Sequence, residues 1–256
     1  MPALKRLIIN ADDLGYDPAV NAGLLRAMRA GLVTSATLLV NTPFSQAGAA
    51  AAHGLAVGLH LNLARGRPVS GAFPEKLLAE GAFAESRADQ LPSWVVEAET
   101  NAQLKLAEQL LGRRPTHLDV HKHLHRHAAV LAGVAAAAAA WGLPVRALDG
   151  PMRSALHGLG ICSPEHFVGE AGSEAYWTLP RLLAAVEGLR PGTTEWMCHP
   201  GETPSHVQSG YAAQRQVELD TFTLPEARAA LERAEVVLTD FRALLPKSAS
   251  ARRGVQ

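Results

Sequence analysis

The segment THLDVHKHLHRH, residues 116–127, holds five of the chain's eleven histidines. Imidazoles can bind a metal ion, titrate near neutral pH or remain as surface groups, so their neighbours decide between these roles. If the segment begins as a β-strand, side chains two residues apart share one face. His117, Asp119 and His121 would then point together, while the apolar residues between them point to the other side. This spacing predicts a polar strand face that ends on an imidazole.

Two other apolar runs also end in polar side chains. Asp13 ends the run at 6–13, and His60 lies near the end of the run at 55–63. With His121, three strands would deliver two imidazoles and one carboxylate to one point, with coordination positions left open. Singly, a histidine at a strand end is usually hydrogen-bonded, and an ADD sequence often caps a turn. Their convergence predicts a catalytic site for one divalent metal ion.

The ligand types leave the identity of this ion open. A carboxylate favours hard ions, and imidazoles accept most divalent ions. Magnesium and zinc are the first choices, and cobalt and manganese also fit.

The other polar residues of the histidine-rich segment are expected to have different roles. Asp119 could orient one of the ligating imidazoles through a hydrogen bond. His123 is expected beside the site, near the ligands or the substrate. His125 and His127 are expected in a solvated turn or an unspecific chelating tract rather than in the metal site.

The elements that must position these residues alternate between strand and helix. Strands are expected at 6–13, 32–41, 55–63, 115–121, 144–148, 193–200 and 235–240. Helices are expected at 17–31, 43–54, 93–112, 128–141, 179–188, 208–220 and 225–233. Such alternation implies an α/β fold with a parallel sheet, closed into a barrel or open and doubly wound. Polar residues at several strand ends favour a TIM-like (β/α) barrel of about seven βα units, in which active-site residues collect at the carboxyl ends of the strands.

Composition indicates a globular protein with a substantial core, since 48% of residues are hydrophobic and 19% are charged. The 24 basic residues balance the 24 acidic ones. No net field therefore draws the chain to nucleic acid or to an anionic membrane, and a small-molecule partner is favoured. Cys162 and Cys198 are far apart and match no disulfide framework or zinc-ribbon spacing.

The ends of the chain and its one alanine-rich stretch bear on localisation. The N-terminus lacks the apolar region and cleavage site of a secretory signal. Residues 128–143 are mostly alanine and are shorter than the roughly 20 apolar residues of a membrane span. We expect a cytoplasmic protein without a membrane span, with a single domain at 1–246 and a flexible tail at 247–256.

Four motifs, in this order along the chain, resemble those of the YdjC-like (ChbG-type) carbohydrate deacetylases: NADDLG, GLHLNL, RRPTHLDVHKHLH and WMCHPGE. The resemblance covers roughly residues 4 to 245. It implies an irregular (β/α) barrel, a divalent metal ion bound by Asp13, His60 and His121, and hydrolysis of an N-acetyl group from an amino sugar or N-acetylated saccharide.

The chemistry that the resemblance implies needs further groups beside the metal. Amide hydrolysis requires an activated water, a stabilised oxyanion and a proton for the departing amine. Asp12 is the expected general base. Because adjacent strand residues normally face apart, the strand must end or bend between Asp12 and Asp13. His199, in the last motif, is the expected general acid.

The segment 64–92 is a candidate lid. It lacks sustained periodicity, and a loop of this length inside a compact domain is usually functional or mobile. Phe73 and Phe83 could stack on a sugar, and Arg65 or Arg67 could donate hydrogen bonds to hydroxyl groups. The alternative is that both phenylalanines anchor the loop to the core.

Three positions depart from the family pattern. Leu14, Lys122 and Glu202 stand where such proteins commonly have phenylalanine, histidine and tyrosine. None is an expected ligand, but the last two lie beside the expected site. The sequence therefore leaves open which sugar is bound, its chain length and any attached lipid.

Two other functions are compatible with the same residues. A pair of histidines with one carboxylate also suits a non-haem iron oxygenase. A non-catalytic protein could instead bind or deliver metal through the histidine-rich tract. Asp12 and His199 favour hydrolysis, since neither alternative needs them. Oligomeric state is open, and a homodimer is consistent with the commonest assembly of soluble proteins.

Overall fold

The computed structural model describes residues 4–71 and 73–245, and the expected tail at 247–256 lies outside them. Its sheet is parallel at every pairing between named strands and runs in the order β4-β3-β2-β1-β6-β5, with β7 pairing to β1. The strands are β1 (Lys5–Leu14), β2 (Ser35–Leu38), β3 (Val57–Leu61), β4 (Leu118–Val120), β5 (His166–Val168), β6 (Gly192–Cys198) and β7 (Val237–Thr239).

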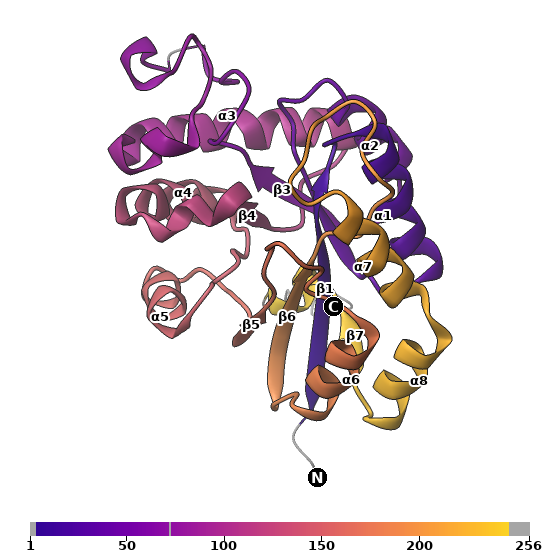
Figure 1. Ribbon diagram of the computed structural model, residues 1–256. Helices are drawn as coiled ribbons and strands as arrows, with labels where there is room; N and C mark the ends of the chain where they lie inside the picture. Colours follow the sequence, from indigo (N-terminus) through magenta and orange to yellow (C-terminus); the bar gives the residue numbers. More distant parts are fainter. Residues whose placement is uncertain (1–3, 72, 246–256) are drawn as a thin grey trace, which may run out of the picture.

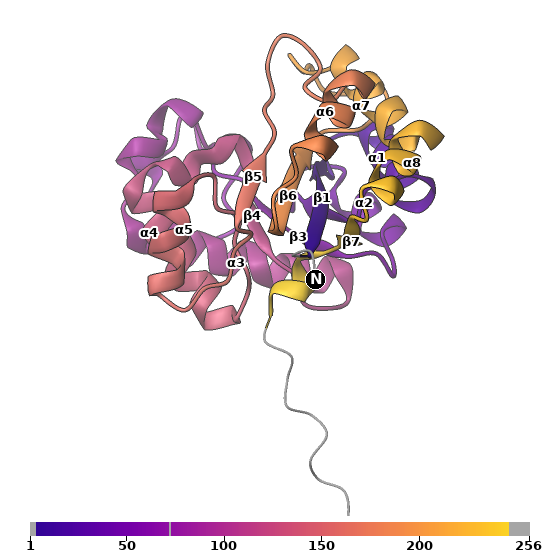
Figure 2. The same cartoon turned by 90° about the horizontal axis from the view of Figure 1, so that it is seen from below.

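Helices surround this sheet (Figures 1 and 2). They are α1 (Pro18–Ala30), α2 (Ser45–Ala51), α3 (Ser93–Leu111), α4 (Ala128–Trp141), α5 (Gly150–Gly158), α6 (Leu179–Glu187), α7 (Ala213–Thr223) and α8 (Pro225–Arg233). Short 3-10 helices lie at η1 (Glu75–Leu77), η2 (Glu85–Gln90), η3 (His121–Arg126) and η4 (Phe241–Leu244). The predicted α/β architecture with a parallel sheet is therefore confirmed.

The sheet is a half-barrel rather than a closed ring of seven βα units. Beyond β4, the sheet continues within the described residues only through an isolated bridge between Leu118 and Val145. The Val145 amide in turn donates to the carbonyl of Cys162. The segment 144–148, predicted as a strand, is thus irregular backbone. β5 and α5 were not predicted from the sequence; β5 has only three residues, all half-buried, so it shows no alternation of buried and exposed side chains.

Local sequence explains the elements that carry the site. β1 is buried on both faces from its third residue onward, as expected of a central parallel strand. Asp17 caps α1 by accepting from the amide of Ala19, and a proline follows at the first helical position. The alanine-rich α4 packs one face against α3 and leaves Ala132, Ala136 and Ala139 exposed on the other, and no helix among residues 4–71 and 73–245 is long and apolar enough to cross a membrane.

The segment 64–92 is folded against the body of the protein. Glu99 of α3 accepts hydrogen bonds from the amides of Val69 and Ser70 at 2.9 and 2.8 Å. Phe73 and Phe83 pack edge to face, with ring centroids 5.1 Å apart, and both are buried in the main core. This arrangement matches the alternative in which the two phenylalanines anchor the segment.

The contact between α3 and α4 depends on Gly133. A Cβ at this position would lie 2.4 Å from the Ser93 carbonyl oxygen and 2.8 Å from the Glu97 amide nitrogen. These are backbone atoms, so the two helices would have to separate. We predict that Gly133→Ala destabilises the protein by about 1–3 kcal/mol and lowers Tm by several degrees in calorimetry. Gly158→Ala is the control, because a Cβ there meets nothing within 4 Å. Equal Tm values for both variants would contradict the close packing.

Candidate metal and catalytic site

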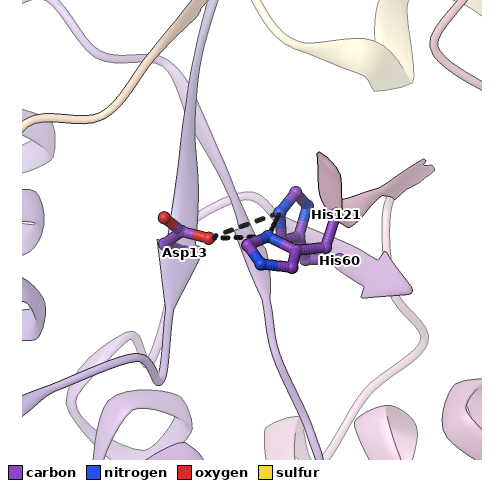
Figure 3. Close-up of side chains that lie close together, drawn as sticks. All are labelled: Asp13, His60 and His121. Carbon is purple, nitrogen blue, oxygen red and sulfur yellow. Dashed lines mark hydrogen bonds and ion pairs between the residues drawn. The ribbon is translucent and has the colours of Figure 1, made fainter. Parts of the chain in front are cut away.

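Three buried side chains from different strands converge at the carboxyl edge of the sheet (Figure 3). Asp13 comes from β1, His60 from β3, and His121 follows β4. Asp13 Oδ1 lies 3.4 Å from His60 Nε2 and 3.2 Å from His121 Nδ1, and the two nitrogens are 3.1 Å apart. The structure therefore brings the three residues expected as metal ligands together at one point.

The spacing of these three atoms fits a metal ion. Donor atoms at about 2.1 Å from one ion lie about 3.0–3.4 Å from each other in octahedral or tetrahedral sites. One carboxylate oxygen and two imidazole nitrogens form a donor set suited to zinc, manganese, cobalt or magnesium. A second cluster of potential ligands, Asp12, His60 and Asp119, is less suited, because Arg146 already pairs with both of its carboxylates.

An unusual backbone conformation brings both Asp12 and Asp13 to the site. Asp13 has φ of 74°, and the register between β1 and β2 shifts between Ala11 and Leu14. The left-handed region is one that aspartate tolerates better than most residues. The strand bends at the point where the sequence required a bend, and both carboxylates line one cavity.

Asp119 fixes the orientation of His60. Its Oδ1 accepts from His60 Nδ1 at 2.6 Å, and its Oδ2 accepts from the Thr37 hydroxyl at 3.0 Å. The hydrogen bond holds the proton on Nδ1, so His60 Nε2 is the nitrogen available to a metal ion. Burial by itself lowers the pKa of His60. The negative charges of Asp119 and Asp12 outweigh this effect and raise the pKa to about 10.

The residue that organises this buried layer is Arg146. Its two Nη atoms donate to the two oxygens of Asp12 at 2.7 Å each, and Nη1 lies 2.9 Å from Asp119. Its Nε donates to Glu195 at 2.7 Å. Burial raises the pKa of Asp12, yet the guanidinium holds it well below its ordinary value. Asp12 is therefore an ionised carboxylate in a fixed orientation.

A second arginine lies on the other side of the metal-ligand cluster. Arg215 of α7 donates through Nη2 to Asp13 Oδ2 at 2.6 Å, which leaves Asp13 Oδ1 facing the two histidines. Burial raises the pKa of Asp13, but Arg215 and the histidines hold it well below its usual range. Sequence reasoning missed Arg215 and Arg146, since neither lies in one of the four motifs or at the end of a predicted strand.

His199 follows β6 and lines the same cavity. Its Nδ1 is buried and has no hydrogen-bond partner among the described residues, so Nε2 is the nitrogen that can face the cavity. Its amide donates to Glu218 at 2.5 Å, and its ring packs against Tyr211 at a centroid distance of 5.3 Å. Burial lowers the pKa of His199 to about 4, so the imidazole is neutral at neutral pH.

A cavity of about 1090 Å³ contains the convergence point. Of the residues expected to contact substrate, Arg65 and His123 line it. Arg67, Phe73 and Phe83 do not, and the aromatic side chains in the wall are instead Tyr16, Phe167, Tyr176 and Tyr211. Most of the segment 64–92 lies away from the cavity, whereas residues 167–172, after and within β5, form part of its wall.

The histidines of the tract lie in different environments. His117 lies below the site, where Nε2 is 3.0 Å from Asn10 Oδ1 and the ring stacks on Phe241. His125 was expected in a solvated turn, but it is fully buried, because η3 turns its ring inward, and burial lowers its pKa to about 3. His127 is exposed, as expected.

Comparison with known proteins identifies the family. The model of the family described as YdjC-like protein matches residues 6–233. The chain belongs to the YdjC-like family. Proteins similar to it include a chitooligosaccharide deacetylase of Serratia marcescens, 35% identical over 94% of this chain and 99% of the relative. A carbohydrate deacetylase of Brevibacillus brevis is 37% identical over 93% of this chain and 99% of the relative.

The fold of this YdjC-like chain also matches a solved structure. A protein of Enterococcus faecalis V583, named for cellobiose-phosphate cleavage, superposes with a TM-score of 0.84 at 26% identity. The match covers 95% of this chain and 100% of the other. The sequence-based recognition of the YdjC-like family is thus confirmed over nearly the whole chain.

We predict that metal binding releases about one proton at pH 7.5. The pKa of His60 is raised from 6.5 to about 10, so below pH 10 the metal-free protein carries a proton that a metal ion must displace. Affinity should therefore rise with pH and level off near pH 10. Calorimetric titration in buffers of different ionisation enthalpy counts the protons, and a count of zero at pH 7.5 would contradict the prediction.

Single-site variants test the ligand set. His60→Ala and His121→Ala should lose bound metal, since each removes one of three converging donor atoms. His127→Ala is the matched control, because this histidine of the same tract is exposed and belongs to neither cluster of potential ligands found in the described chain. Elemental analysis of the purified variants gives the result. Metal loss in His127→Ala alone would exclude the assigned ligands.

Proposed function

We propose that this protein is a metal-dependent hydrolase that removes an N-acetyl group from an amino sugar or N-acetylated saccharide and releases acetate. The observation that carries the proposal is the composition of one cavity. It holds a carboxylate and two imidazoles suited to a metal ion, an adjacent ionised carboxylate, and a histidine from another strand. Relatives named as carbohydrate and chitooligosaccharide deacetylases support the same reaction.

A divalent ion held by Asp13, His60 and His121 would supply Lewis acidity toward water and the acetyl carbonyl. Asp12 accepts the proton of the attacking water. Its bidentate pairing with Arg146 keeps it ionised at working pH and fixes its orientation.

His199 faces the leaving nitrogen through Nε2. With a pKa of about 4 it is neutral in the resting protein. Negative charge that develops on the substrate during attack raises the pKa of a nearby imidazole. His199 therefore takes up a proton from solvent at this stage and gives it to the leaving nitrogen as the C–N bond breaks. The proton that Asp12 took from the attacking water returns to solvent afterwards.

The sugar would lie in the outer part of the cavity. Phe167 and Tyr176 offer aromatic faces for stacking, a role first expected of Phe73 and Phe83. Arg65 is exposed at the cavity wall, where its guanidinium lies 5.2 Å from the Tyr16 ring centroid and can reach hydroxyl groups. In this proposal only the parts of the segment 64–92 that line the cavity, around Arg65 and Glu85, act as a lid.

Two alternative functions are less consistent with the same site. A metal-delivery protein would gather its histidines at one surface, but of the tract only His121 belongs to a cluster of potential ligands within the described residues. An iron oxygenase has no use for an ionised carboxylate paired with Arg146 beside its ligands. Oxygen consumption without acetate release would favour the oxygenase.

The test of the proposal separates catalysis from metal binding. Asp12→Asn and His199→Ala should retain the metal but lose about a hundred- to ten-thousandfold in kcat/KM, the usual contribution of one acid or base. Acetate release from a panel of N-acetylated saccharides, metal content and Tm are measured on the same samples. Folded, metal-loaded variants with near-normal turnover would exclude the assigned acid and base.

A further inference from the structure

A buried carboxylate on α7 joins three segments of the cavity wall. Glu218 is fully buried. Its Oε2 accepts from the His199 amide at 2.5 Å, and its Oε1 accepts from the Tyr211 hydroxyl at 2.6 Å and the Trp177 amide at 3.3 Å. The donors belong to the residue after β6, to the loop before α7 and to the loop before α6.

Tyr211 extends this set of contacts. Its hydroxyl donates to Glu218 and accepts from the Tyr176 amide at 2.9 Å. Its ring lies against the imidazole of His199, with the planes inclined by 61°. Glu218 thus contacts His199 twice, directly through the backbone and indirectly through the ring of Tyr211.

The imidazole of His199 lacks an anchor of its own. Nδ1 makes no hydrogen bond within the described chain, and the ring has no carboxylate partner there of the kind that Asp119 provides for His60. The direction of Nε2 therefore depends on the His199 backbone and on the packing of Tyr211. Both of these are fixed by Glu218.

We propose that Glu218, acting through Tyr211 and the His199 amide, is the positioning residue that aims His199 at the leaving group. The proposal rests on the function proposed above for His199. It assigns α7 two tasks on one helical face, because Arg215, three residues before Glu218, bonds the carboxylate of Asp13.

Glu218→Gln is the informative change. Glutamine keeps the size of the side chain but has one oxygen and one NH₂ group, so one of the two carboxylate positions would present a donor to a donor. Either the His199 amide or the Tyr211 hydroxyl then loses its partner. We expect kcat to fall about tenfold to hundredfold, since small misplacement of a catalytic group has effects of this size, with KM and metal content little changed.

Asp220→Asn is the matched control. It makes the same carboxylate-to-amide change on the same helix, but Asp220 is exposed and its side chain bonds only Gln216 in the described structure. This variant should keep full activity. Tyr211→Phe removes one hydroxyl and provides a milder variant should Glu218→Gln fold poorly. It should lower kcat in the same direction by a smaller factor.

A double-variant cycle with His199→Ala distinguishes positioning from a structural role. If Glu218 acts through His199, Glu218→Gln should cost little more once the imidazole is gone. Losses that multiply in the double variant, or a loss confined to KM, would overturn the proposal.

A measurement independent of activity separates this inference from the proposed function. The short hydrogen bond should shift the His199 amide proton downfield in NMR spectra of the whole protein, and Glu218→Gln but not Asp220→Asn should move it. If the wild-type protein released no acetate from N-acetylated sugars, the proposed function would fail while this resonance still reported on the contact. An unchanged resonance in Glu218→Gln would overturn the positioning role.

Discussion

The guanidinium of Arg146 is the interaction on which the interior of this sheet depends. It pairs with carboxyl groups from β1, β4 and β6, namely Asp12, Asp119 and Glu195, in a buried layer. Without it, three buried acids would face one another, and removing one partner of a buried ion pair typically costs about 3–5 kcal/mol. The pairing also has a chemical result, because it keeps Asp12 ionised and leaves Asp119 free to orient His60.

The site has two halves that rely on different parts of the fold. The half with the expected metal ligands is fixed from below by Asp119 of β4 and by Arg146 from the irregular segment 144–148. The half with His199 is fixed from the side by Glu218 of α7, and the same helix also supplies Arg215 to Asp13. The cavity lies between these two supports, so its polar groups have fixed orientations.

Sequence patterns located the residues that end strands but not those that support them. Asp13, His60 and His121 were found because parallel strands end at one edge and period-two spacing shows which side chains share a face. Arg146 and Glu218 lie in irregular backbone and in a helix, where nothing marks an inward-facing charge before the fold is known. His125 was misplaced because the turn of η3, with Lys122 and His123 at positive φ, reverses the simple alternation of the strand.

The order of these residues along the chain means that the expected metal ligands are synthesised before the expected proton carrier. The three expected ligands all lie within the first 121 residues, whereas His199, Arg215 and Glu218 come in the last quarter of the chain. During synthesis the ligands therefore leave the ribosome well before the histidine and the helix that aims it. β6, which completes the centre of the sheet by pairing with β1 along seven residues, also belongs to this late part. A ribosome-bound chain that has just exposed the three expected ligands is thus still without the proposed proton carrier.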